Sequence, residues 1–218
     1  MTRNSLMYVK YPRTYHLPWS PGMHDDDKMM SDVSAFDGQD VVVTEKMDGE
    51  CTTMYTDYIH ARSINSGSHT SRDWVKAFHR QICGDIPVGW RVNVENMYAK
   101  HAIFYDQLET YAYGFAIWDD KNYTLDWDTT LEWFKLLGIT PCPVIYRGIF
   151  DKNAIETAYK CASEDHECEG YVVRLVKSFH YKEFRTNVGK YVRKGHIQNA
   201  AHWFYGQKVV PNAVKKPC

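Results

Sequence analysis

Short apolar runs rich in Val, Ile and Tyr recur along the chain, separated by polar stretches that contain Gly, Pro, Asn or Asp. Runs of about four to eight such residues, bounded by turn-forming residues, are typical of β-strands. The pattern predicts strands at residues 40–45, 51–55, 58–62, 90–95, 111–118, 142–146, 170–176 and 189–193.

Between several of these strands, apolar residues recur every three or four positions, which is the spacing of an amphipathic helix. Of three such helices, the first ends near Cys83 and the second ends at Gly138, a residue type that commonly follows a helix. The side chains that can cap the three helices are Ser71, Asp126 or Asp128, and Asp151. Many strands joined by hairpins and flanked by helices indicate the α+β class.

The chain has 218 residues with 44% apolar content, enough for one sizeable core. We expect a single domain over 1–218, with 1–39 as an irregular wrap around the body and 199–218 as a short tail. No run of about 18 apolar residues could span a bilayer, and the N-terminus lacks the apolar segment of a signal peptide. These features predict a soluble, cytoplasmic protein with no membrane partner.

The six cysteines are scattered without a Cys-x-x-Cys pair, so the spacing indicates neither a zinc site nor a disulfide framework. Cys161, His166 and Cys168 lie close enough in sequence to suggest a metal site. No second cluster completes a set of four ligands, which favours a loop at the end of a helix as the explanation. Reduced thiols are therefore the expectation.

Charge is unevenly distributed along the chain, although the net charge is only −1. The part before Tyr171 carries about −10 and the part from Tyr171 onward about +9, with aromatic residues interleaved among the cations. Backbone charge supplies much of the affinity for nucleic acid, and aromatic faces stack on bases. A basic tail that docks on the acidic body is the alternative, but the pattern favours contact with a nucleotide or nucleic acid.

One short motif carries candidate chemistry. Residues 45–50 read Glu-Lys-Met-Asp-Gly-Glu directly after the apolar run 41–44. A lysine at the end of a buried strand can become a nucleophile when burial and nearby cations lower its pKa from about 10.4, so Lys46 is the candidate. Taken alone, the motif also fits a hairpin turn with a solvated lysine.

Five further motifs follow in order: Ala61-Arg62-Ser63, Val94-Glu95-Asn96, Tyr113 to Asp119, Glu169 to Arg174, and Lys190-Tyr191-Val192-Arg193-Lys194. Their order and spacing resemble the collinear motifs of the covalent nucleotidyltransferases, the superfamily of ATP-dependent DNA ligases, RNA ligases and mRNA capping enzymes. The detail is most similar to the ATP-dependent RNA ligases of the RNA ligase 2 type. The resemblance covers roughly residues 40–200.

The resemblance implies a nucleotidyltransferase (ATP-grasp-like) fold in which two antiparallel sheets hold the nucleotide between them. It implies an enzyme that joins RNA ends, a 5′-phosphate and a 3′-hydroxyl, through AMP carried on a lysine, with ATP and Mg²⁺ or Mn²⁺ as cofactors. About twenty residues follow His196, so we expect no OB-fold domain. We expect a monomer.

The resemblance also assigns roles to residues. Lys46 would carry the AMP, and Lys190 and Lys194 would assist catalysis. Glu169 and Glu95 would serve the metal. The residues expected to contact the nucleotide, with Phe115 stacking on adenine, are Glu45, Lys46, Met47, Asp48, Gly49, Arg62, Glu95, Phe115, Glu169, Lys190, Arg193 and Lys194.

Two features leave alternatives open. Cys51 stands where these RNA ligases commonly have asparagine, and the last motif has Lys190 and Lys194 in place of two lysines one residue apart, which makes its register ambiguous. The rival functions are a capping-type guanylyltransferase that uses GTP, a DNA ligase, and a non-catalytic nucleotide- or RNA-binding relic. The first two normally need a following OB-fold.

Overall fold

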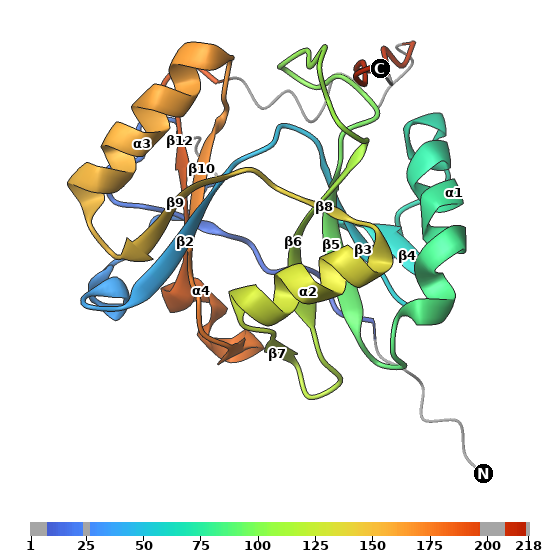
Figure 1. The fold of residues 1–218 in the computed structure, drawn as a ribbon, viewed down its shortest axis with the longest axis horizontal. Coiled ribbons are helices and arrows are strands. Elements are labelled where there is room, and N and C mark those ends of the chain that lie inside the picture. Colours follow the sequence, from blue (N-terminus) through green and yellow to red (C-terminus); the bar gives the residue numbers. More distant parts are fainter. Residues whose placement is uncertain (1–7, 24–26, 197–207, 217–218) are drawn as a thin grey trace.

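The computed structural model describes residues 8–23, 27–196 and 208–216. Its described residues form two mostly antiparallel sheets that lie side by side, with helices on their outer faces (Figure 1). This arrangement confirms the predicted α+β class. Each predicted strand has a counterpart, whereas four two-residue strands were too short for the hydrophobic pattern to indicate.

The first sheet has the strand order β1-β12-β10-β2-β9. Neighbours pair antiparallel, except that β1 runs parallel to β12. The bounds are β1 Tyr15–His16, β2 Asp40–Glu45, β9 Val144–Ile149, β10 Gly170–Leu175 and β12 Val188–Val192.

The second sheet has the order β11-β7-β6-β5-β3-β4, and β8 pairs with β6 in parallel. The bounds are β3 Glu50–Met54, β4 Ile59–Ala61, β5 Arg91–Asn96, β6 Ala112–Trp118, β7 Tyr123–Thr124, β8 Thr140–Pro141 and β11 Phe179–His180. Since β2 belongs to the first sheet and β3 to the second, residues 46–49 cross from one sheet to the other.

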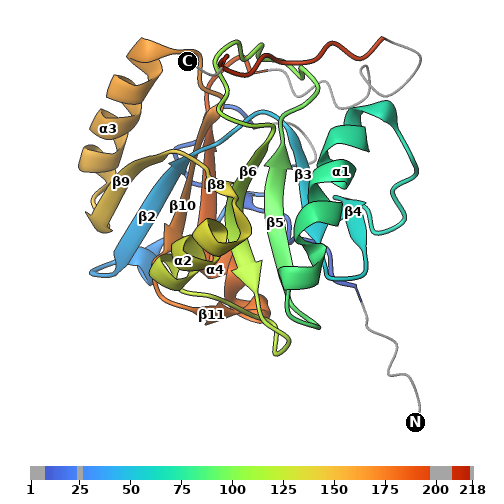
Figure 2. The same ribbon diagram turned by 45° about the vertical axis from the view of Figure 1, so that its right-hand side comes forward.

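The three predicted helices form, but only the second and third have the expected capping residues. The Ser71 cap predicted for the first helix was wrong, because Ser71 lies in a 3-10 turn before α1, and the N-cap residue Arg72 makes no side-chain capping bond. The Asp126 and Asp151 carboxylates accept main-chain N–H bonds at the starts of α2 and α3, and Gly138 ends α2 with φ 66°. Two views place α3 outside the first sheet and α1 outside the second (Figures 1 and 2). The bounds are α1 Asp73–Ile82, α2 Trp127–Leu137, α3 Lys152–Asp165 and α4 Phe184–Asn187.

The register of the first sheet fixes which side chains face the second sheet. Thr44 lies opposite Val172, and Val172 lies opposite Lys190, so these residues share one face. Arg174 is on the same face and donates to the Leu125 carbonyl oxygen at 2.9 Å, which ties the two sheets together. The opposite face packs against α3, where Tyr171 and Tyr159 have ring centroids 5.1 Å apart.

Gly170 is required where β10 meets β12. A Cβ atom added at this position would lie 1.9 Å from the carbonyl oxygen of Tyr191, closer than any side chain allows. The glycine therefore permits the close strand pairing that brings Glu169, the preceding residue, beside Lys46.

The N-terminal segment contacts both sheets: the main-chain N–H of Val9 donates to the hydroxyl of Tyr55, the residue after β3, whereas the described residues from Tyr15 to Met30 lie against the first sheet. The main-chain N–H of Leu17 donates to the Lys190 carbonyl oxygen at 2.7 Å, and the N–H of Met30 donates to the His16 carbonyl oxygen at 2.7 Å. Residues 208–216 lie against the loop that follows β5, while 199–207 and 217–218 of the expected tail fall outside the described residues. Among the described residues, no helix combines the length and the apolar character needed to cross a membrane.

Candidate active site

Lys46 is the first residue after β2, and its main-chain N–H donates to the Gly170 carbonyl oxygen at 2.9 Å. Its Nζ donates to Oε2 of Glu169 at 2.7 Å. The lysine side chain is 21% exposed and the glutamate side chain 1% exposed. The lysine amino group, which solvent can reach, is thus held against a buried carboxylate, and the two residues are 123 positions apart in the chain.

The charges around Lys46 raise the pKa of its ammonium group. Burial alone would lower that pKa, but the carboxylates of Glu169, Glu95 and Asp48 outweigh the effect of burial. From the sequence we expected nearby cations to lower the pKa of Lys46. In the free protein the nearby carboxylates raise it instead. The amine is therefore protonated until positive charge enters the site.

Asp48 is fixed by the loop that follows β5. Its Oδ2 accepts from the main-chain N–H groups of Ala102 and Ile103, each at 2.8 Å, and its own N–H donates to the Tyr105 hydroxyl at 3.1 Å. Burial would raise the pKa of Asp48, but contacts from His196 and the Ile103 N–H lower it overall. The carboxylate is held ionised in one orientation.

Asp48, Glu169 and His196 form a cluster of buried groups that fits a divalent metal ion. One ligand atom from each lies within 4.8 Å of the others. Nε2 of His196 is 3.6 Å from Oδ1 of Asp48 and 3.6 Å from Oε1 of Glu169, and both ring nitrogens lack a hydrogen-bond partner among the described residues. Within the described part of the chain, this buried imidazole lies between two carboxylates but accepts or donates no hydrogen bond. Together the three side chains offer one nitrogen and two oxygen ligands, which Mn²⁺ or Mg²⁺ could bind together with water.

The sequence pattern did not identify His196. It follows the last recognised motif and belongs to no periodic pattern, so its only signal is its position two residues after Lys194.

Glu95 faces the same space from β5. Burial raises its pKa to about 8, and the charges of Glu169, Asp48 and Glu50 add to this while Lys46 opposes it. Cys51 lies opposite Glu95 in the pairing of β3 with β5. A thiol therefore stands beside this acid, where the resemblance led us to expect an amide.

The three cations of the last motif, Lys190, Arg193 and Lys194, have different surroundings. Lys190, on the inner face of β12, donates from Nζ to Oδ1 of Asp27 at 3.1 Å, and burial followed by the charge of Lys46 lowers its pKa. Arg193 pairs with Glu167 and donates from Nε to the Cys168 carbonyl oxygen at 3.0 Å. Lys194 is exposed in the turn after β12. The structure thus brings Lys190 close to Lys46 and directs Arg193 elsewhere.

Asp27 also contacts His16, and the sequence pattern had identified neither residue. Its Oδ2 lies 3.1 Å from Nε2 of the fully buried His16. The parallel pairing of β1 with β12 places His16 opposite Lys190. The N-terminal segment therefore supplies the counter-charge of a motif lysine.

The remaining nucleotide candidates surround this centre at different depths. Phe115 is half-buried on β6 and packs edge to face on Tyr11, with ring centroids 5.0 Å apart. Met47 is buried in a small apolar cluster beyond the lysine. A Cβ on Gly49 would lie 2.7 Å from the Asn96 carbonyl oxygen, so this glycine allows β3 to approach β5 closely. Arg62 is exposed after β4.

Glu45, the residue before Lys46, is engaged on the α3 side of the first sheet. Its Oε2 lies 2.9 Å from Nε2 of His166, the residue directly after α3. The thiol sulfur of Cys168 is 3.4 Å from the same nitrogen. Successive residues of a strand point to opposite faces. Glu45 and Lys46 accordingly make separate sets of contacts.

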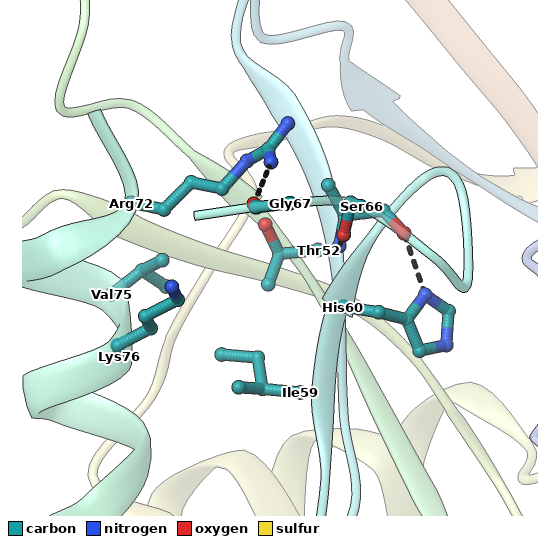
Figure 3. Close-up of a pocket in the computed structure, with 9 residues that line it drawn as sticks. Thr52, Ile59, His60, Ser66, Gly67, Arg72, Val75 and Lys76 are labelled. Atoms are coloured by element: carbon teal, nitrogen blue, oxygen red, sulfur yellow. Dashed lines mark hydrogen bonds between the residues drawn. The ribbon is translucent and has the colours of Figure 1, made fainter. Parts of the chain in front are cut away.

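A separate small cavity lies between β3, β4 and α1 (Figure 3). Arg72 lines it and donates from Nε to Oε2 of Glu50 at 2.7 Å and from Nη1 to the Gly67 carbonyl oxygen at 2.7 Å. Its charge is thereby neutralised. The cavity's importance for the site is indirect, because Arg72 fixes Glu50, whose carboxylate contributes to the raised pKa of Glu95.

The geometry can be compared with known proteins. Three structures of RNA ligase from Naegleria gruberi resemble the chain: one with pyrophosphate (15% identity, TM-score 0.54, covering 88% of this chain and 61% of that one), one mutant with ATP and Mn (14%, 0.53, 87% and 57%) and one mutant with AMP and Mn (16%, 0.51, 75% and 52%). At these identities the likeness concerns the fold. The chain spans roughly half to three fifths of the length of these structures.

No curated protein sequence gives a significant match. The family model described as RNA ligase matches residues 39–192, which is well over half of the chain and includes Lys46, Glu95, Glu169 and Lys190. On this match, together with the two-sheet fold, the chain belongs to the RNA ligase family.

Proposed function

We propose that the protein is an ATP-dependent RNA ligase that joins a 5′-phosphate to a 3′-hydroxyl through AMP carried on Lys46. The observation that carries the proposal is the contact of Lys46 Nζ with Glu169 at 2.7 Å, inside a group of charges that includes Asp48, Glu95 and Lys190. Family membership and the neighbours solved with ATP, AMP and pyrophosphate support it.

In the first step, Nζ of Lys46 would form a bond to the α-phosphorus of ATP while the bond from that phosphorus to the bridging oxygen breaks and pyrophosphate leaves. The ammonium must lose a proton beforehand, and Oε2 of Glu169 is the acceptor in position to take it. The 5′-phosphate of RNA would then displace the lysine, and the 3′-hydroxyl would finally displace AMP.

Asp48, Glu169 and His196 are the residues that would hold Mg²⁺ or Mn²⁺. A bound cation supplies positive charge that stabilises the departing phosphates and lowers the pKa of a nearby amine. Glu95, which we expected to bind the metal, is close to this group: the charges of Glu169 and Asp48 raise its pKa, and that of Lys46 lowers it.

Lys190 would neutralise the α-phosphate, because its ammonium lies on the same sheet face as Lys46, where it donates to Asp27. Phe115, half-buried between the sheets, would stack on adenine. Glu45 would reach the adenine amino group only through Oε1, since Oε2 is taken by His166. Arg62, Arg193 and Lys194 lie farther out, where they would contact phosphates of RNA.

The nucleotide is tested by incubating the protein with radiolabelled ATP or GTP and a divalent cation, then measuring covalent label after denaturation. Label from ATP that is lost in Lys46→Ala supports a ligase. Label from GTP would instead support the capping-type alternative, and no label from either would support the non-catalytic relic that Cys51 suggests.

The substrate is tested with pre-adenylylated strands that differ only in sugar. We expect RNA ends to be sealed to a 3′-hydroxyl RNA strand better than all-DNA equivalents, because the 2′-hydroxyl is the local feature that distinguishes them. Each phosphate contact should make the slope of the logarithm of the binding constant against the logarithm of the salt concentration more negative by about 0.7 to 0.9. Equal sealing of nicked DNA with no salt dependence would contradict the RNA assignment.

A further inference from the structure

A second cluster of metal-ligating side chains lies outside the catalytic group. Glu45, His166 and Cys168 each place one ligand atom within 4.8 Å of the others. They come from the end of β2, the residue after α3 and the segment before β10, so the fold brings them together. Sequence spacing suggested Cys161, His166 and Cys168, but in the structure Glu45 takes the place of Cys161, which is exposed on α3.

The separations within this cluster are close to those of zinc ligands. With bond lengths of about 2.3 Å to sulfur and 2.0–2.1 Å to nitrogen and oxygen, a tetrahedral ion holds its sulfur and nitrogen ligands about 3.6 Å apart and its nitrogen and oxygen ligands about 3.4 Å apart. The observed separations are 3.4 Å between Cys168 Sγ and His166 Nε2, and 2.9 Å between His166 Nε2 and Glu45 Oε2. An outward shift of a few tenths of an ångström makes room for the ion.

A buried acceptor in the cluster has no partner. The Glu45 side chain is 3% exposed, and its Oε1 has no hydrogen-bond partner among the described residues. A buried carboxylate oxygen left unpaired costs free energy in the isolated protein. A cation bound at Oε2 would place positive charge beside Oε1 and reduce that cost.

Access to the cluster is one-sided. Cys168 is buried, while the His166 side chain is 48% exposed, so solvent reaches the cluster through the imidazole. A site with three protein ligands and one open side leaves a fourth position for water, the usual arrangement of a zinc ion that is not fully enclosed by protein.

We propose that Glu45, His166 and Cys168 bind a thiophilic divalent cation of the zinc class, separately from the Mg²⁺ or Mn²⁺ of the catalytic group. Thiolate and imidazole ligands select zinc, whereas magnesium prefers oxygen ligands throughout. On binding, a bond forms between the metal and Sγ of Cys168, the S–H bond breaks, and the proton passes to solvent.

The position of the site suggests what it does. Glu45 is bonded directly to Lys46, and the ion would join the end of β2 to the end of α3 and to the segment that carries Glu169. The metal would stiffen the backbone on both sides of the Lys46 and Glu169 contact. The inference does not depend on the proposed ligase activity.

The test is a titration of the full-length, metal-free protein with Co²⁺ in excess Mg²⁺, followed by competition with Zn²⁺. Cobalt bound to a thiolate gives a sulfur-to-metal charge-transfer band in the near ultraviolet. The group of Asp48, Glu169 and His196 contains no sulfur, so the band distinguishes a cysteine site from that group, and the variants below assign it to Cys168. We expect the charge-transfer band to saturate at one equivalent of thiolate-bound Co²⁺ and to disappear when Zn²⁺ displaces the cobalt.

Matched variants separate the ligands from the fold. Cys168→Ser and His166→Ala should lose the charge-transfer band, with His166→Ala informative because an exposed side chain contributes little to folding. Cys161→Ser, which changes an exposed cysteine of the neighbouring helix, should keep it. Absence of the band in the wild-type protein, or its persistence in either Cys168→Ser or His166→Ala, would overturn the proposal.

Discussion

The C-terminal segment gives the sharpest structural prediction, because Asn212 holds the loop that orients Asp48. Its Nδ2 donates to the Met97 carbonyl oxygen at 2.8 Å, and its Oδ1 accepts from the Tyr105 N–H at 3.0 Å. Tyr105 in turn accepts from the N–H of Asp48 through its hydroxyl. Asn212 is 2% exposed, so these bonds lie away from water.

Replacing Asn212 with alanine should destabilise the protein and slow adenylylation. The change leaves one buried donor and one buried acceptor unpaired, at about 1–3 kcal/mol each, and water entering the space restores part of this, which gives about 2–4 kcal/mol overall. If the freed loop also weakens one charged hydrogen bond to Asp48, worth about 1.5–3 kcal/mol, adenylylation should slow by about ten- to a hundredfold.

The assay measures the single-turnover rate of lysyl-AMP formation well below the melting temperature, alongside thermal unfolding. Ile155→Ala is the matched control, because Ile155 is fully buried on α3, away from the Asp48 loop, and its truncation costs a similar 2–5 kcal/mol or so. We expect both variants to melt earlier and only Asn212→Ala to react slowly. If both react at the wild-type rate, the segment stabilises the protein without positioning Asp48.

Three further predictions concern the charges and packing of the site. Glu95 has a folded-state pKa of about 8 against an ordinary value of 4.5, so the folded protein holds a proton that the unfolded chain lacks between these values, and stability should fall as pH rises through this window. Glu95→Gln should flatten that fall in denaturant titrations at pH 5 and pH 8, and an unchanged profile would contradict the assignment. Lys190→Ala should slow adenylylation by at least about a hundredfold, whereas Arg193→Ala, whose guanidinium pairs with Glu167, should stay within about threefold; the reverse order would show that the register of the last motif is misassigned. Gly170→Ala should lower the free energy of unfolding by about 3 kcal/mol or more, because its Cβ would meet the Tyr191 carbonyl oxygen, and a near-wild-type melting temperature would refute this close approach.

Much of the fold follows from sequence patterns because its longer strands are apolar runs and its helices are periodic. Apolar runs identified β5 and β12, which carry Glu95 and Lys190, and β2, which Lys46 follows, while the capping aspartates identified α2 and α3. The two-residue strands are too short to show a period, so the parallel pairing of β1 with β12 could not be predicted.

The site was predictable only where its residues fall in ordered motifs. His196, Asp27 and Asn212 carry no local pattern, and each acts on a motif residue distant in sequence. Asp27, for example, reaches Lys190 across 163 positions. The direction of the Lys46 pKa was also inaccessible, because it depends on how many carboxylates the fold places near the amine compared with cations.

The central claim is that Lys46 carries the nucleotide, and the most direct measurement is the intact mass of the protein after incubation with ATP and Mn²⁺, with the modified residue identified by peptide mass spectrometry. The account predicts a mass increase of one adenylyl group located on Lys46, reversed by added pyrophosphate and absent from Lys46→Ala. An adduct on another residue, an adduct that persists in Lys46→Ala, or no adduct on the folded wild-type protein would contradict it.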